Sequence, residues 1–184
     1  MDLFLIKHKL KNDFPLVREA TIPHPQRAAV MVMLYPKPKK IHVLMTKRAT
    51  HLKYHAGEIS FPGGVFEEDH DDDLLTTALR ETEEELDIQV EPENVLGRLP
   101  IVNTRLGFEI TPFVSILPSA PEYMPAENEV GEVLEIPFIS LLSTQQRDVG
   151  SKPGKDGVMY WFKHHRIWGA SAKILNQIGH LSSY

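Results

Sequence analysis

The sequence predicts a mixed α/β fold, in which one mixed β-sheet is covered by helices. Apolar and β-branched runs precede the best helical pattern of the chain, and further runs of this kind follow it. A length of 184 residues fits one domain, and 42% hydrophobic residues are enough for a real core. We therefore expect a single domain over residues 1–184, with residues 1–26 as an N-terminal extension that packs on it.

The expected elements follow from the spacing of apolar residues and from turn signals. The expected strands are Arg27–Tyr35, Ile41–Thr46, Val95–Val102, Glu109–Ile116, Val130–Ile136 and Val158–Phe162. The segment Pro36–Lys40 between the first two strands reads as a turn. The expected helices are Met1–Leu10, Leu74–Leu86 and Ala170–Leu181. Asp71, Asp72 and Asp73 are the N-cap candidates of the central helix.

Charge and composition exclude several classes of protein. The net charge of −5 gives no general attraction to nucleic acid or to anionic membranes, so an anionic substrate needs a bound cation or local Lys and Arg. The chain has no cysteine, which excludes disulfides, thiolate metal sites and thiol nucleophiles. The first residues lack a basic segment followed by a long apolar one, so we expect no secretory signal, and no apolar run approaches the roughly 18–20 residues needed to span a bilayer. We expect a soluble, cytoplasmic protein, and a homodimer remains open.

Three glutamates stand out on the central helix. At about 100° per residue, Glu81, Glu84 and Glu85 fall within roughly a third of the helix circumference. The core-facing stripe of the same helix is separate and consists of Leu75, Leu79, Thr82 and Leu86. Clustered like charges destabilise a helix slightly and suit a hard cation with oxygen ligands, Mg²⁺ or Mn²⁺. For a glutamate-rich helix alone, a solvated acidic face is the more common interpretation, and the context of the helix decides between the two.

The stretch Phe61-Pro62-Gly63-Gly64 favours the metal site, because a glycine pair lets backbone approach a metal or phosphate closely. Joined to Arg80-Glu81 and Glu84-Glu85, it resembles the Nudix box. This sequence departs from the box in three ways. Two extra residues separate Gly64 from Arg80, Thr82 takes an apolar place, and Asp87 replaces a late glycine. The counterpart of the first glutamate of the box is Asp72 by counting back from Arg80; its rivals are Glu67, Glu68 and Asp69.

The resemblance implies the α/β/α sandwich of the Nudix family and a set of site residues. The metal ligands would be Glu81 and Glu85, with Glu84 assisting and the Gly63 carbonyl as a further ligand. Arg80 would orient the glutamates through an ion pair. The attacking water needs a base, and the candidates are Glu129 and Glu127, in a loop ahead of the strand that begins at Val130. The implied catalytic residues are thus Glu84, Glu129 and Arg80.

A second resemblance narrows the substrate. The segment Leu44–Ala49, with Lys53, Gly57 and Phe61–Gly64 after it, resembles the signature of coenzyme A pyrophosphatases, and so do the later segments Asn128–Val130 and Arg166–Ala172. That subfamily usually has Arg where Lys53 stands, which replaces a two-armed phosphate contact by a point charge. The implied reaction is hydrolysis of coenzyme A or acyl-coenzyme A to 3′,5′-ADP and 4′-phosphopantetheine. The implied phosphate-binding residues are Lys47, Arg48, Lys53 and His55.

Alternatives remain at this point. The substrate of such an enzyme could instead be ADP-ribose or a dinucleotide. A binding protein that has lost catalysis is disfavoured by the intact Glu81, Glu84 and Glu85, and an RNA-decapping enzyme by the acidic balance. We expect Trp168 to be a core residue in preference to a ligand platform. We expect His164-His165-Arg166 to be a plain strand end in preference to a metal or phosphate site.

Overall fold

The computed structural model describes residues 3–18, 24, 26–38, 40–149 and 157–181, and its arrangement confirms the predicted mixed α/β fold. Met1 and Asp2 of the expected first helix, and part of the expected N-terminal extension, lie outside the described residues. Within the described part, no helix is long and apolar enough to cross a membrane.

The main sheet is built around β1 (Arg27–Lys37). This strand pairs in parallel with β7 (Glu109–Ile116) and antiparallel with β2 (Lys40–Arg48), so the sheet is mixed. The path is β3-β2-β1-β7-β5, and β4, β6 and β8 pair with β1, β7 and β2 respectively. The other strands of this sheet are β3 (Ile59–Ser60), β4 (Gly63–Val65), β5 (Val95–Arg98), β6 (Val102–Asn103) and β8 (Val130–Pro137).

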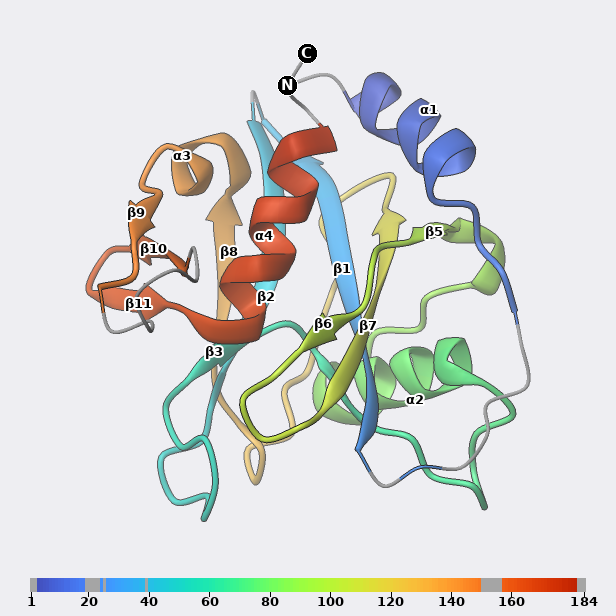
Figure 1. Ribbon diagram of the computed structural model, residues 1–184, viewed down its shortest axis with the longest axis vertical. Coiled ribbons are helices and arrows are strands. Elements are labelled where there is room, and N and C mark those ends of the chain that lie inside the picture. The colour runs from blue at the N-terminus through green and yellow to red at the C-terminus, as the bar shows by residue number, and fades with distance from the viewer. Residues whose placement is uncertain (1–2, 19–23, 25, 39, 150–156, 182–184) are drawn as a thin grey trace.

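The helices cover both faces of this sheet, which gives the three layers of an α/β/α sandwich (Figure 1). They are α1 (Leu3–Asp13), α2 (Leu74–Leu86), α3 (Phe138–Leu142) and α4 (Gly169–Leu181), with a 3-10 turn at Pro92–Asn94. One core cluster joins the sheet to α1 and α4, and a second joins its other face to α2. A small antiparallel sheet of β9 (Gln146–Arg147), β10 (Val158–Phe162) and β11 (His165–Ile167) lies beside α4.

The ends of α2 are fixed by two aspartates. Asp73 is the N-cap, because its Oδ1 accepts a hydrogen bond of 2.8 Å from the Thr76 backbone N–H. The helix ends at Asp87, whose φ of +56° is left-handed. Glycine adopts this conformation most easily and aspartate tolerates it, so Asp87 meets the same backbone requirement as the late glycine of the Nudix box. The bounds Leu74–Leu86 agree with the sequence prediction.

Two local predictions were wrong. The expected strand Val95–Val102 is divided into β5 and β6, because Pro100 has no N–H to donate to a ladder. The turn expected over Pro36–Lys40 is shorter, since β1 continues to Lys37 and β2 begins at Lys40. The glycine pair Gly63-Gly64, for which no element was predicted, is part of strand β4 and pairs with β1.

Candidate active site

The glutamates of α2 lie against the glycine pair of β4. Gly64 pairs with Ala29 of β1, and a Cβ added to Gly64 would overlap the carboxylate of Glu81. Any larger residue at position 64 would therefore displace that carboxylate. A backbone hydrogen bond from Gly63 reaches Glu85. The sequence analysis expected a metal or phosphate close to the glycine pair; in the structure, the side chains of Glu81 and Glu85 lie against its backbone.

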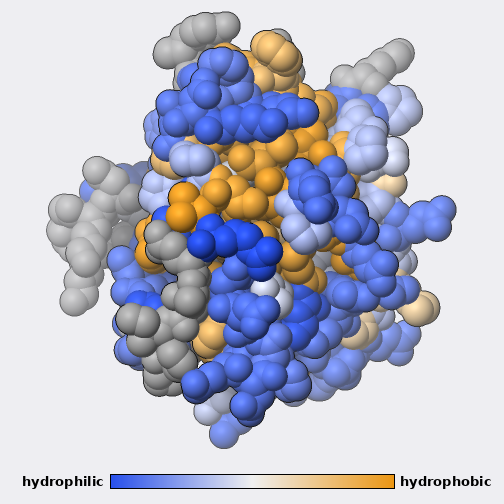
Figure 2. Space-filling model, turned by 90° about the vertical axis from the view of Figure 1, so that its right-hand side faces the viewer, coloured by the Kyte–Doolittle hydropathy of each residue, from blue (hydrophilic) through white to orange (hydrophobic). Residues whose placement is uncertain are grey.

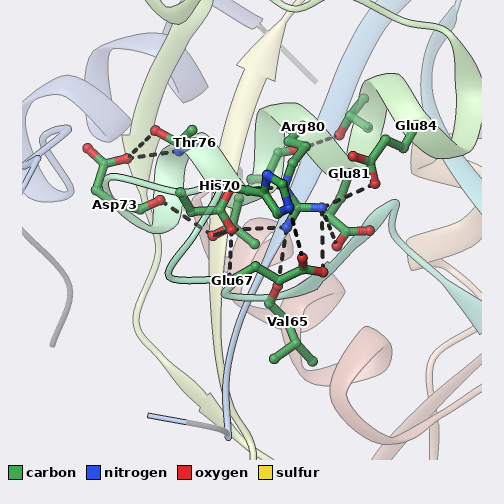
Figure 3. Close-up of polar contacts among 12 residues, drawn as sticks. Val65, Glu67, His70, Asp73, Thr76, Arg80, Glu81 and Glu84 are labelled. Carbon is green, nitrogen blue, oxygen red and sulfur yellow. Dashed lines mark hydrogen bonds and ion pairs between the residues drawn. The ribbon is translucent and has the colours of Figure 1, made fainter. Parts of the chain in front are cut away.

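Arg80 stands at the centre of the polar network in Figure 3. Its Nη1 donates to Glu81 Oε1 at 3.0 Å and to Glu84 Oε2 at 3.1 Å. Its Nη2 also donates to the Val65 carbonyl at 3.4 Å. The guanidinium therefore fixes one oxygen of each of two glutamates, which is the orienting geometry that the sequence analysis expected of Arg80.

The main partner of Arg80 is Asp71, a residue that the sequence analysis did not select. Arg80 Nε donates to Asp71 Oδ1 at 2.9 Å and Nη2 donates to Oδ2 at 3.0 Å, a two-armed pair. Asp71 is buried, whereas Asp72 is exposed, and Glu67 comes no closer to Arg80 than 4.0 Å. Counting along the sequence pointed to Asp72, but Asp71 occupies the position that anchors the arginine.

Hydrogen bonds decide the ionisation of Asp71. Burial alone would raise its pKa, but the hydrogen bonds from Arg80, from the Glu67 N–H and from Thr77 outweigh burial and lower the pKa below its ordinary value. The carboxylate of Asp71 is therefore held in its charged form and serves as a fixed counter-ion for Arg80.

Glu85 is in the opposite situation. It is 4% exposed, its Oε2 has no hydrogen-bond partner, and the nearest cation is Arg48 Nη1 at 3.9 Å from Oε1. Burial, reinforced by the charge of Glu81, raises the pKa of Glu85 to about 8. Burial also raises the pKa of Glu81, although Arg80 opposes this. Arg80 pairs with one oxygen of Glu81, whereas Glu85 has no hydrogen-bonded counter-ion and keeps its proton to a higher pH than an ordinary glutamate. A bound cation would favour the charged form of Glu85.

The loop before β8 is tied to the C-terminal end of α2 by its backbone. The Met124 N–H donates to the Leu86 carbonyl at 2.8 Å, and the Ala126 N–H donates to the Glu85 carbonyl at 2.9 Å. Glu129 follows, and its carbonyl accepts from the Ala49 N–H at 2.8 Å. The charge of Glu129 raises the pKa of both Glu81 and Glu85, so its carboxylate lies in their electrostatic reach. Glu127, the other candidate base, is exposed.

The four expected phosphate-binding residues are not brought together. Arg48 lies beside Glu85 and has a buried Nε without a partner. Lys53 and His55 lie on a loop that is closed at Arg48 by two backbone hydrogen bonds. There His55 pairs with Glu58 at 3.0 Å, and the Lys53 ammonium lies 5.2 Å from the ring centre of the exposed Tyr54.

Lys47 lies elsewhere. Successive residues of a strand point to opposite faces, and Lys47 acts electrostatically on His165 of β11. Because β10 and β11 pack into the core cluster that contains α4, Lys47 belongs to the face opposite α2. The structure therefore separates Lys47 from the glutamates. The alternation of side chains along β2 was the signal that could have distinguished it from Arg48.

Two further expectations concern the end of the chain. Trp168 is not a core residue: it is exposed, and the Arg166 guanidinium lies 5.7 Å from the centre of its ring. The adjacent Ile167 occupies the core position instead. His165 and Arg166 lie in β11, as a strand end would, and Arg166 donates to Asp148 at 2.8 Å.

The carboxylate oxygens on α2 are suitable ligands for a hard divalent cation. Glu81 and Glu85 are neighbouring carboxyl groups on one helix, and one buried oxygen of Glu85 has no hydrogen-bond partner. In the described part of the chain, no three acidic or imidazole side chains already form a ligand cluster. Arg80 explains why, because it holds an oxygen of Glu81 and an oxygen of Glu84.

Comparison with known proteins agrees with this geometry. The model of the NUDIX domain matches residues 25–152. The protein named "Uncharacterized Nudix hydrolase NudL" of Escherichia fergusonii is 34% identical over 182 residues, which are 97% of this chain and 92% of the relative. The NudL protein of Photorhabdus laumondii is 37% identical over 157 residues, 83% of each chain.

Solved structures share the fold. A MutT/nudix family protein from Enterococcus faecalis has a TM-score of 0.60 at 13% identity and covers 98% of this chain and 74% of its own. The NUDIX domain of Shewanella oneidensis NrtR, solved with ADP-ribose, has a TM-score of 0.53 at 21% identity and covers 66% of this chain and 79% of its own.

The match over residues 25–152 and the near full-length NudL relatives show that the chain belongs to the Nudix family. It is a hydrolase that acts on phosphoric anhydrides, in a family whose members generally depend on a divalent metal ion.

Proposed function

We propose that this Nudix hydrolase cleaves the pyrophosphate bond of coenzyme A or of an acyl-coenzyme A, and releases 3′,5′-ADP and the 4′-phosphopantetheine half. The observation that supports this most is the position of Arg48 beside Glu85. Arg48 belongs to the segment that resembles the coenzyme A pyrophosphatase signature, and its guanidinium lies 3.9 Å from the buried carboxyl group of Glu85. An anionic pyrophosphate needs both a cation there and a metal.

Each site residue has a role in this proposal. Glu81 and Glu85, assisted by Glu84 and the Gly63 carbonyl, would hold Mg²⁺ or Mn²⁺, which would polarise the phosphoryl oxygens and acidify water. Arg80 orients Glu81 and Glu84, and it is itself anchored by Asp71. Glu129 accepts the proton of the attacking water, because it comes from a separate, backbone-anchored loop and its charge acts on the two glutamates.

The rest of the substrate would extend along the loop closed at Arg48. Arg48 lies beside the glutamates and suits the pyrophosphate, while Lys53 and His55 are farther out on the same loop. Lys53 is exposed and is therefore free to meet the 3′-phosphate of the adenosine half. Lys47 has no role in this arrangement, because it belongs to the other face of the sheet.

The direct experiment compares substrates. Purified protein with Mg²⁺ or Mn²⁺ is offered coenzyme A, dephospho-coenzyme A, ADP-ribose and NADH, and the products are identified by mass. We expect the highest kcat/KM for coenzyme A, with 3′,5′-ADP as a product. ADP-ribose is the alternative substrate, since the structurally similar NrtR domain binds it. Higher kcat/KM for ADP-ribose would replace the coenzyme A proposal and leave the Nudix chemistry intact.

Variants test the phosphate contact. Dephospho-coenzyme A lacks the 3′-phosphate and should be a markedly poorer substrate for the parent protein. Lys53→Ala should bring the kcat/KM values of the two substrates together. Lys47→Ala is the matched control, because it removes a neighbouring lysine from the opposite face and should preserve the difference. Equal kcat/KM for both substrates in the parent protein would show that this phosphate is not recognised.

A further inference from the structure

A cavity of about 150 Å³ lies at the N-terminal end of α2, away from the glutamates. Its buried lining comprises Asp73, Leu75, Thr111 and Phe113, and its more exposed lining includes Arg18, Arg98 and Ile101. The rise of about 1.5 Å per residue puts Leu75 about 15 Å from Glu85 along the helix axis. The cavity is therefore separate from the candidate active site.

Its face of the molecule is the one that Figure 2 turns toward the viewer. That face includes α1, β5 and the beginning of α2, which lie at the right of Figure 1. Hydrophobic residues are exposed in its middle and hydrophilic residues surround them (Figure 2). The lining of the cavity on this face combines apolar side chains, Leu75 and Phe113 among them, with charged ones.

The charges around the cavity do not cancel. Three arginines and two carboxylates line it. Asp73 already accepts from Arg18 Nε at 2.7 Å and caps α2 through Thr76. Glu109 pairs with Arg27 at 3.6 Å. Among the residues that the structure describes, Arg98 is left with no side-chain hydrogen bond or ion pair, so the margin has one positive charge in excess.

Size and chemistry together restrict the occupant. A volume of about 150 Å³ is large enough for one benzene-sized ring, and Leu75, Ile101 and Phe113 are apolar side chains on which it can pack. A ring placed over Leu75 and Phe113 would bring an anionic substituent to the margin, where Arg98 and the outer nitrogens of Arg18 can donate to it. A neutral or cationic ligand would gain nothing from that margin.

We infer that this cavity is a second binding site, for a small organic anion with a ring-sized apolar body and a carboxylate or phosphate head. Its apolar body rests on Leu75 and Phe113, and its head is bound by Arg98 and Arg18. This inference does not depend on which anhydride the glutamates cleave.

The test is an NMR titration of the ¹⁵N-labelled protein, followed at the amide and arginine Nε signals. The probes are benzoate and phenyl phosphate, with benzyl alcohol as the uncharged analogue of the same size. We expect saturable shifts at Arg98, Arg18 and Ile101 with an anionic probe. Benzyl alcohol should bind at least tenfold more weakly. Tighter binding of either anion identifies the head group. Binding of neither, or equal binding of benzyl alcohol, overturns the inference.

Arg98→Met keeps the apolar stem and removes the charge, and it should weaken binding of the anionic probe at least tenfold. Arg98→Lys should restore part of the affinity. Arg147→Met is the matched control, since Arg147 is an exposed arginine on β9 outside the cavity, and it should change nothing. Unchanged affinity in Arg98→Met contradicts the inference, and the comparison with benzyl alcohol stands even if that variant does not fold.

A kinetic measurement separates this site from the substrate site. Because the two lie about 15 Å apart along α2, a saturating anionic probe should leave the KM of the hydrolysed anhydride unchanged. A KM that rises in proportion to the probe concentration would show that the cavity is part of the substrate site, and would overturn its assignment as a second one.

Discussion

Four acidic residues at or near α2 are at least partly shielded from water, yet their surroundings shift their pKa values in opposite directions. Asp71 and Asp73 precede the helix and have lowered pKa values, while Glu81 and Glu85 lie in its second half and have raised ones. Burial opposes the charged form in all four. The difference is made by the hydrogen-bond donors around the aspartates and by the deeper burial of the glutamates.

The first pair is satisfied by the protein itself. Asp71 accepts from both arms of Arg80 and from Thr77, and Asp73 accepts from Arg18 and Thr76. Glu85 keeps an unpartnered oxygen beside the charge of Glu81. The protein itself stabilises the charged form of the aspartates, whereas Glu85 ionises readily only where a bound cation offsets its burial and the charge of Glu81.

The largest expected effect is on Glu85. Glu85→Gln keeps the shape and removes the charge, so turnover should fall at least ~10²-fold, as for a group that acts mainly in the transition state. In EDTA the variant should unfold at a temperature equal to or above that of the parent, because the carboxyl group that it replaces is buried beside Glu81 and has no hydrogen bond at Oε2. Enzyme assay and thermal unfolding measure the two effects.

Glu83→Gln is the matched control for this change. Glu83 lies on the same helix, is exposed, and is not among the groups that shift the pKa of Glu85. It should leave turnover unchanged. Near-normal activity of Glu85→Gln would remove Glu85 from the active site.

Glu129 should behave as a catalytic group without being a metal ligand. Glu129→Gln should lower kcat on the order of 10²-fold, the lower range for loss of a general base. It should also remove the acid limb of the kcat–pH profile, while Mn²⁺ affinity measured by calorimetry stays within a few-fold of the parent. If the variant keeps the parent kcat and acid limb, the base lies elsewhere, and Glu84 is the next candidate.

A change at Asp71 is expected to act mainly on the stability of the fold. Asp71→Asn removes the charge that pairs with Arg80 and should lower the free energy of unfolding by about 2 kcal/mol, the scale of a hydrogen bond to a charged group. Urea unfolding measures this. Asp72→Asn changes the exposed neighbour and should cost nothing measurable. Equal losses in the two variants would contradict the assignment of Asp71 as the anchor.

The smallest effect is an acid dependence of stability. The folded-state pKa of Asp71 and Asp73 lies below the ordinary value of 3.8, so the unfolded chain binds protons first as pH falls. Their contribution is complete well above pH 3.8 and is lost as pH falls through the folded pKa values. Urea unfolding between pH 6 and 3 in EDTA should show this loss, and Asp71→Asn should flatten it. An identical slope in the variant would refute the linkage.

The sequence was sufficient where a pattern repeats over many residues. The stripe of Leu75, Leu79, Thr82 and Leu86 predicted α2 and its buried face, and the apolar runs predicted β1, β7 and β8. The glycine pair predicted a close approach of its backbone to a metal or phosphate, but the sequence indicated neither that the pair lies in a strand nor that Glu81 packs against it.

The sequence was insufficient where either of two adjacent residues could take the same buried position. Asp71 and Asp72 have the same chemistry, and only folding decides that the first is buried against Arg80. Trp168 was expected in the core, but adjacent Ile167 takes that position. The burial of Glu85 was also not foreseen, because a glutamate beside two others reads as a solvated face until the strand and the loop that cover it are placed.

The most direct test of this account is the ionisation of the four carboxylates, followed by ¹³C NMR in the metal-free protein. We predict that Asp71 and Asp73 titrate below 3.8 and that Glu85 titrates near 8, because it is buried next to Glu81. Addition of Mg²⁺ should lower the titration point of Glu85, since a bound cation favours the charged form. A Glu85 carboxyl that titrates near the ordinary 4.5, and does not respond to Mg²⁺, would contradict the account.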